Sequence, residues 1–434
     1  MLRAVVEGMS SQDPPKTPPS NDRAPGSPRM FAPKRADLRD LNYIGWAICS
    51  FVLAMGLHQS LTKGGKRDFV YFYSAGHLLN HYSPARLYDF ALQKKIVEEL
   101  LPEPLKAGQP GLFVYPPHVA VFFQPFAMLS YWTACQLWLA ISLTLYLAGL
   151  CLLIKRFCGG DLFQRSLFLW FGLSFWPFIP WILHSGQVSA IGFLAMALAV
   201  YWEDLERHFL SGLALSICTY KPTLLLLILP MLLVIRRPRT LAGFGAGAFT
   251  AIAVAALAGG PQIWVSYIGA SADKTNEIFQ VFPVTLDLRA LAGAVPHAGR
   301  FTLALLMCAA GIAGACLAGL WWRARKFAQH GPATPIWAAT ITWTLLFNVY
   351  VPVYDSVLVL VGIIASAGFL VRYVPRLFCG LCLALLVSSY FSTQMSSQIG
   401  WQLLTPVLAA IGFLQMFACW RAIDEQQRAF AANP

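Results

Sequence analysis

Runs of about 18 or more apolar residues recur along the sequence between Leu41 and Trp420, and they constrain the fold more than any other feature. An apolar segment of that length allows an α-helix to cross a bilayer. The chain is 57% hydrophobic and only 12% charged, whereas soluble proteins are about 25% charged. These values exclude a soluble enzyme, a secreted disulfide scaffold and a disordered protein. The runs do not alternate every second residue, so they also exclude a membrane β-barrel.

We therefore predict an all-α polytopic membrane protein with about twelve transmembrane helices and both ends in the cytoplasm. The expected spans are 40–57, 131–154, 166–183, 188–202, 209–220, 221–235, 240–258, 301–320, 333–350, 356–372, 376–393 and 401–420. We expect a disordered cytoplasmic tail over 1–38, a transmembrane domain over 39–422 and a second cytoplasmic tail over 423–434.

The net charge of +12 could indicate nucleic-acid binding, but the basic residues lie mostly at one side of the apolar segments. That distribution follows the positive-inside rule. We therefore expect no nucleic-acid partner and a multi-pass protein of the cell inner (plasma) membrane. The basic groups that carry this argument are Lys155, Arg156 and Arg165; Arg236, Arg237 and Arg239; Arg323, Arg325 and Lys326; Arg372 and Arg376; and Arg421.

Two segments interrupt the regular pattern of spans. Residues 116–130 are apolar but short and contain Pro125, so we predict a re-entrant or partly inserted helix on the outer side. In 209–235, the Lys221-Pro222 pair breaks the apolar run. Two short helices that meet at this pair would keep the Arg236 cluster in the cytoplasm, whereas one long helix would not.

Two long outer loops are expected, at 58–115 and 259–300, and loops of such length are usually functional. In the first loop, the spacing predicts a helix from Asp68 to Asn80 with Phe69, Phe72, Tyr73 and Leu79 on one face. A second helix is expected from Phe90 to Leu101, capped by Asp89 and ended by Pro102. Both helices are amphipathic, so we expect them to lie in the membrane interface.

Polar residues in or near the membrane are candidates for function, because a charge at the membrane centre costs about 2.5–3.5 kcal/mol. Asp68 follows Lys66 and Arg67 at the start of the first loop helix. Its carboxylate could accept a proton from a sugar hydroxyl as a general base. The alternative is that Asp68 caps the helix, and from the spacing alone we favour the cap.

Lys221 and Asp355 are further charged candidates. Lys221 is expected at the tip of two half-spans, with no acidic residue near it in sequence. Its partner could be a distant carboxylate, a backbone carbonyl or a lipid phosphate, and we favour the phosphate. Asp355, after Tyr354, could cap an outer helix or meet a substrate, and we favour the cap. Arg289 in the second loop is a phosphate candidate.

Other outer residues could contact a sugar or phosphate. Tyr115 and His118 flank a rigid Pro116-Pro117 pair, and His184 and Gln187 lie at an outer edge between two spans. A structural corner and an ordinary turn are the alternative interpretations of these segments. The sequence contains no phosphate-binding GxxxxGK[ST], no HExxH and no GxSxG, so we expect no nucleotide cofactor and no metal site.

The order of several motifs resembles one known family. The motifs are Arg67-Asp68-Phe69 with the aromatic residues Tyr71–Tyr73, Leu87-Tyr88-Asp89, Tyr115-Pro116-Pro117, Gly186-Gln187 and Lys221-Pro222-Thr223. Over about residues 40–420 the chain resembles the polyprenol-phosphate-mannose-dependent mannosyltransferases of glycosyltransferase family 87, which have the GT-C fold.

The resemblance implies an active site facing the periplasm and an inverting, metal-independent transfer from a polyprenyl monophosphate sugar. Asp68 matches the essential carboxylate of the family, and Lys221 falls where related enzymes bring cations to the lipid phosphate. The family often has a histidine near the position of Tyr354-Asp355 in this chain, and this departure leaves the acceptor open.

The implied mechanism assigns a role to each charged group. Asp68 would deprotonate the acceptor hydroxyl, and Lys221, with Arg67 or Arg289, would stabilise the departing polyprenyl phosphate. The expected partners are a polyprenyl-phosphate sugar donor, a lipid-linked or glycan acceptor and the lipid bilayer. Alternatives are a transporter or lipid flippase, a GT-C enzyme using another polyprenyl-phosphate sugar, and a non-catalytic assembly subunit.

Overall fold

A computed structural model of the chain describes residues 35–62, 68–101, 112–159, 162–278, 286, 288, 300–325, 334–348, 350–399 and 402–432. The chain divides into two units, Met1–Leu41 and Asn42–Pro434. The description below concerns the second unit, which begins within the first helix. Most of the expected N-terminal tail lies outside the described residues.

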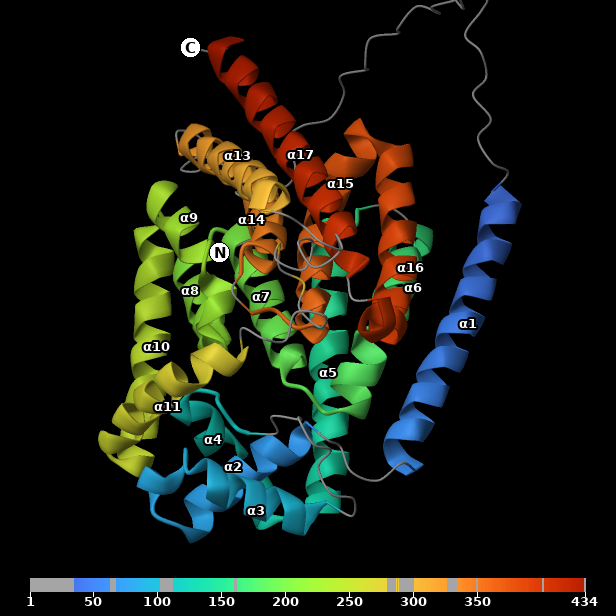
Figure 1. Ribbon diagram of the computed structural model, residues 1–434. Helices are drawn as coiled ribbons and strands as arrows, with labels where there is room; N and C mark the ends of the chain where they lie inside the picture. The colour runs from blue at the N-terminus through green and yellow to red at the C-terminus, as the bar shows by residue number, and fades with distance from the viewer. Residues whose placement is uncertain are drawn as a thin grey trace, which may run out of the picture. The chain divides into compact units, whose positions relative to one another are not determined.

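The described residues form helices connected by short turns (Figure 1). The α-helices are α1 (Arg35–Thr62), α2 (Phe69–His81), α3 (Phe90–Leu100), α4 (Pro117–Phe123), α5 (Tyr131–Phe157), α6 (Leu162–Ser174), α7 (Ser189–Asp204), α8 (His208–Ser216), α9 (Ile228–Val234), α10 (Pro238–Gly259), α11 (Gln262–Ile278), α13 (Arg300–Ala324), α14 (Thr334–Leu346), α15 (Val359–Tyr373), α16 (Pro375–Ile399) and α17 (Leu404–Ala432). The short helices are η1 (Pro84–Arg86), η2 (Phe126–Met128), the π-helix η3 (Phe178–His184), η4 (Ile217–Tyr220), η5 (Pro222–Leu225) and η7 (Val353–Leu358).

The helices establish a polytopic helical membrane protein, but they do not establish the count of twelve spans. Within the described residues, six helices are long and apolar enough to cross a membrane. A seventh span results if α6 and η3, which are bent by 67° at their junction, are counted together. Every predicted span contains a helix, yet several of these helices are short. Hydropathy identifies an apolar run, but it does not show how long the helix within that run is.

The segment from α8 to α9 forms a hairpin whose tip is Lys221. Its two arms are α8 with η4 and η5 with α9, and Lys221 lies between the two short helices. Both ends of the hairpin reach the same carboxylate, because His208 contacts Glu203 at 3.0 Å and Arg237 contacts it at 2.8 Å. The prediction of two short helices meeting at Lys221-Pro222 is therefore confirmed.

Helix α7 runs from Asp355 at one end to the basic residues Arg156 and Arg237 at the other. Ser189, its first residue, donates a hydrogen bond to Asp355. Asp204, its last residue, pairs with Arg156 at the end of α5 at 2.6 Å. The sixteen residues of α7 span about 24 Å at 1.5 Å per residue. Lys221 and Asp355 thus lie a helix length away from the basic cluster.

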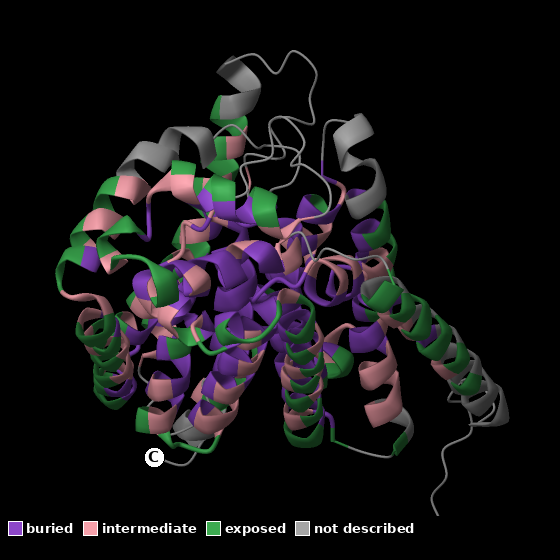
Figure 2. Cartoon of the chain, turned by 90° about the horizontal axis from the view of Figure 1, so that it is seen from below, coloured by how far each residue is buried: buried purple, intermediate pink, exposed green. Residues whose placement is uncertain are grey.

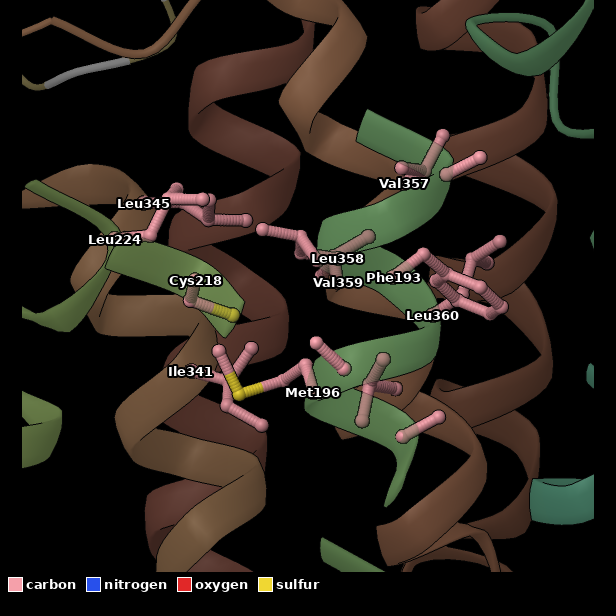
Figure 3. Packing of buried hydrophobic residues seen from close by; sticks show 14 of the residues in the cluster. Phe193, Met196, Cys218, Leu224, Ile341, Leu345, Val357, Leu358, Val359 and Leu360 are labelled. Atoms are coloured by element: carbon pink, nitrogen blue, oxygen red, sulfur yellow. The ribbon is translucent and has the colours of Figure 1, made fainter. Parts of the chain in front are cut away.

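Apolar side chains from α7, η4, η5, α14, η7 and α15 fill the space between these two ends (Figure 3). Met196, Ile341 and Leu358 are among the side chains that pack there, and each is at most 1% exposed. The span that includes α15 is mostly buried, whereas few residues of α10 and α13 are buried. Figure 2 shows buried residues gathered at the centre of the view and exposed residues toward its edges. Exposed apolar helices of this kind are suited to contact with lipid tails.

Helices α2, α3 and α4 pack together beside the start of α5 (Figure 1). The predicted helices at 68–80 and 90–101 are confirmed, with small differences at their ends, and Asp89 caps α3 by accepting a hydrogen bond from the amide of Leu92. The prediction that α2 lies in the membrane interface stays a prediction, but the apolar face of α2 does not point to lipid. Phe69, Phe72 and Tyr73 are buried against protein, because α4, η2 and α5 cover that face.

The expected re-entrant segment is also packed on α2. The amide of Asn80 donates to the carbonyl of Gln124, and the hydroxyl of Tyr73 donates to the carbonyl of Leu129. Helix α4 has only seven residues, too few to cross a bilayer. The segment therefore stays beside α2 and leads directly into α5.

Candidate functional site

A buried ion pair marks the site at the tip of the hairpin. The ammonium of Lys221 donates to Oδ2 of Asp355, and the hydroxyl of Ser189 donates to Oδ1 of the same carboxylate at 2.7 Å. Lys221 is 8% exposed and Asp355 is 1% exposed. Buried charges are retained when they are paired and hydrogen-bonded, and these three residues meet that condition.

The partner of Lys221 is thus the distant carboxylate, one of the options that the sequence left open. The favoured prediction that Asp355 caps a helix is wrong. Pro352 holds the N-cap position of η7, and the carboxylate of Asp355 is used by Lys221 and Ser189 instead. The binding of a lipid phosphate by Lys221 stays a prediction.

Three tyrosines surround the ion pair. The ammonium of Lys221 lies 5.0 Å from the ring centre of Tyr350 and 5.3 Å from that of Tyr354, distances at which cation–π attraction operates. Tyr115 shares a hydrogen bond with Tyr354. Burial, followed by repulsion from Asp355, raises the pKa of Tyr350 to about 12, and Asp68 adds a smaller repulsion. The phenol of Tyr350 therefore stays protonated at neutral pH.

Asp68 belongs to the same cluster. Its charge acts on Tyr115, Tyr350 and Tyr354, the tyrosines that also surround Lys221. Asp68 occupies the N-cap position of α2. Within the described residues, its side chain accepts no capping hydrogen bond from the first turn of that helix. The capping interpretation of Asp68 is therefore not supported, and the carboxylate is partly exposed beside the tyrosines.

The segment from Ser185 to Ser189 positions both carboxylates. The carbonyl of Ser185 accepts hydrogen bonds from the backbone amides of Asp68 and Phe69 at 3.1 and 3.0 Å. Four residues later, Ser189 holds Asp355. Between them, the carbonyl of Gly186 accepts a hydrogen bond from the indole of Trp138 at 2.8 Å. We call residues 185–189 the carboxylate-positioning segment.

Gly186 in this segment cannot be replaced without strain. Its φ angle is +77°, a region that side chains disfavour. An added Cβ would lie 2.8 Å from Cβ of Phe69, which is fully buried. We expect Gly186→Ala to lower the free energy of unfolding by about 1–3 kcal/mol and to reduce activity, because Phe69 adjoins Asp68.

A shift in thermal unfolding measured in detergent tests this expectation. Gly245→Ala is the matched control, since an added Cβ there meets nothing within 4 Å and alanine favours a helix interior. Equal stability of the two variants would contradict the proposed strain at Gly186.

The remaining predicted site residues lie next to the carboxylate-positioning segment, near the hairpin tip, or outside the described residues. His184 ends η3 and precedes the carboxylate-positioning segment, and Gln187 is part of that segment. His118 approaches Thr219 near the hairpin tip at 3.5 Å, and burial lowers its pKa to about 4. Arg67 and Arg289 lie outside the described residues.

Sequence reasoning missed Ser189, Trp181 and Asn348. The ring of Trp181 lies 6.1 Å from that of Tyr354. The side-chain amide of Asn348 donates to the carbonyl of Thr223, which ties the segment before Tyr350 to the hairpin tip. Ser189 stands two residues after Gln187, one of the predicted site residues, but a serine at a helix start gives no local indication of a partner at position 355.

The comparison with known families gives the site its chemical context. The sequence matches the model of glycosyltransferase family 87 over residues 113–352, more than half of the chain. The chain belongs to glycosyltransferase family 87. We find no significant match among curated proteins or solved structures.

Membership of family 87 identifies the protein as a membrane glycosyltransferase. The matched region includes Tyr115, the hairpin with Lys221, and Tyr350. Asp355 lies just after the matched region and Asp68 lies well before it, so the assignment of both residues to the site of this glycosyltransferase depends on geometry. They converge on tyrosines that the matched region supplies.

Proposed function

We propose that this family 87 glycosyltransferase transfers a sugar, mannose in our assignment, from a polyprenyl monophosphate donor to a lipid-linked or glycan acceptor. The observation that carries the proposal is the convergence of Asp68 and Lys221 on Tyr350 and Tyr354. A base for the acceptor and a cation for the leaving phosphate must both lie near the reacting carbon. The cluster supplies one of each.

In the proposed reaction, Asp68 accepts the proton of the acceptor hydroxyl while the hydroxyl oxygen bonds to the anomeric carbon of the sugar. The bond from that carbon to the phosphate oxygen breaks, and the polyprenyl phosphate leaves with one additional negative charge. Attack from the face opposite the phosphate inverts the anomeric configuration. The phosphate itself activates the donor, and the mechanism assigns no step to a metal.

Lys221 is the proposed cation for the departing phosphate. Its side chain is held at the hairpin tip, beside the tyrosines on which Asp68 also acts. Preorganised charges of this kind commonly contribute about 3–4 kcal/mol to transition-state stabilisation. Arg67 and Arg289, which lie outside the described residues, are proposed as further cations for the phosphate.

We further propose that the site faces the periplasm and that about twelve segments cross or enter the inner membrane. The distribution of basic residues supports this orientation. Arg156, Arg323 and Arg372 lie in the last turns of α5, α13 and α15, and Arg237 follows α9. Positive residues favour the cytoplasmic side, and α7 separates this end from Asp355.

Reconstitution with radiolabelled polyprenyl-phosphate mannose and candidate acceptors tests the proposed function. We expect label to move from the donor to an acceptor with inverted anomeric configuration. Labelled polyprenyl-phosphate glucose and arabinofuranose are run in parallel. Preferential transfer of either sugar would refute the choice of mannose, and retention of configuration would refute the single displacement.

The donor assignment predicts a specific effect of Lys221→Ala. A hydrogen bond to a charged group contributes about 1.5–3 kcal/mol, so the half-saturating donor concentration should rise by about 10–100-fold. Lys95→Ala is the control, because Lys95 is an exposed lysine on α3. Donor titrations of the two variants give the comparison, and an unchanged half-saturating concentration for Lys221→Ala would count against the phosphate role.

A further inference from the structure

Asp355 is enclosed by protein, and each of its carboxylate oxygens already binds a protein group. One of its oxygens accepts from Ser189 and the other from Lys221, and the residue is 1% exposed. A sugar hydroxyl would have to displace one of these buried partners to reach it. Its contacts are with the protein, and its charged partner is the proposed phosphate cation.

Lys221 retains donor capacity toward a ligand. An ammonium group has three donors, and within the part of the chain that the structure describes it uses one of them, to Asp355. The faces of Tyr350 and Tyr354 lie beside the same ammonium. The ammonium is therefore fixed by one carboxylate and two rings, and it can still donate to an incoming phosphate.

The backbone on both sides of the ion pair is also restrained. Lys221 donates its amide to the carbonyl of Cys218 and accepts at its carbonyl from the amide of Leu224. Asn348 binds the carbonyl of Thr223 and accepts from the amide of Tyr350. The hairpin tip and the segment that leads to Asp355 are thus linked by more than the ion pair alone.

We propose that Asp355, held by Ser189, is a positioning residue that keeps the Lys221 ammonium in place for the phosphate of the lipid donor. This inference rests on the proposed function and refines it. Asp355 acts only through Lys221 and does not contact the sugar. The alternative is that Asp355 competes with the phosphate for Lys221. The two hypotheses predict opposite changes in the affinity for the lipid donor when the carboxylate of Asp355 is neutralised.

Binding of radiolabelled decaprenyl monophosphate to the full chain in one detergent distinguishes them. We expect Asp355→Asn and Lys221→Met each to weaken binding at least tenfold. The double variant should bind no more than twofold more weakly than Lys221→Met alone, because Asp355 has no effect without the lysine. Asp355→Glu, which keeps the charge, should recover part of the affinity. Asp89→Asn is the control, since Asp89 caps α3 away from the ion pair.

Several outcomes would overturn the proposal. Equal or tighter binding by Asp355→Asn would show competition, and a double variant weakened by the product of the single effects would show an independent role. If Asp355→Asn does not yield folded protein, Ser189→Ala provides the same test, with weaker binding expected in the wild-type background and no effect in the Lys221→Met background. Absence of binding by the wild-type chain would instead refute the donor class itself, and with it this inference.

Discussion

Asp68→Asn should reduce sugar transfer by about 10²–10⁴-fold, the usual contribution of a general base. The substitution preserves the size of the side chain and removes its ability to accept the acceptor proton. The backbone amide of Asp68 still donates to Ser185, so the start of α2 stays in place. Expression and thermal stability should therefore be close to those of the wild type.

The measurement is the initial rate of transfer from the labelled donor at saturating donor and acceptor. Asp89→Asn is the matched control, because it makes the same chemical change in the same loop, at a residue whose role is to cap α3, and asparagine caps about as well as aspartate. Normal turnover by a well-folded Asp68→Asn protein would remove Asp68 as the base.

Glu203→Ala should cause the largest loss of stability. Glu203 is 2% exposed and pairs with Arg237 and His208, while Thr240 donates to it at 3.2 Å. Without the carboxylate, the buried charge of Arg237 loses its counter-ion, which costs about 3–5 kcal/mol. The closed end of the hairpin would loosen, and Lys221 at the tip would be less well held.

We expect the apparent unfolding temperature of Glu203→Ala in a fixed detergent and at a fixed scan rate to fall by about 10 °C. The control is Glu98→Ala, an exposed glutamate on α3 whose nearest salt bridge, to Lys94, measures 3.8 Å. Exposed pairs of this type contribute about 0–1 kcal/mol. A similar unfolding temperature for both variants would show that Glu203 does not hold the hairpin closed.

Features governed by local sequence could be predicted well. The break at Lys221-Pro222 predicts the hairpin, because a proline interrupts a helix and the positive-inside rule decides the direction of the second arm. Asp89 at a helix start predicts the cap that the structure shows. The assignment of Asp68 to the site comes from the family resemblance and stays a prediction.

Features that depend on distant partners could not be predicted from the sequence. Lys221 and Asp355 are 134 residues apart, and no local pattern links them. The apolar face of α2 gave no indication of whether lipid or protein covers it, because both environments favour Phe69 and Phe72 equally. The sequence locates the break at Lys221, but it does not indicate that each arm divides into a short α-helix and a short 3-10 helix, because both kinds of helix suit the same apolar residues.

The carboxylate-positioning segment has a consequence for how the enzyme can diverge. Four peptide bonds separate the Ser185 carbonyl, which binds the amide of Asp68, from Ser189, which binds Asp355. If Asp68 is the base and Lys221 the cation as proposed, the chain length at this point sets the spacing of the two charges. We then expect substitutions around the tyrosines to change which sugar or acceptor is accommodated, and the insertion or deletion of a single residue between 185 and 189 to abolish transfer.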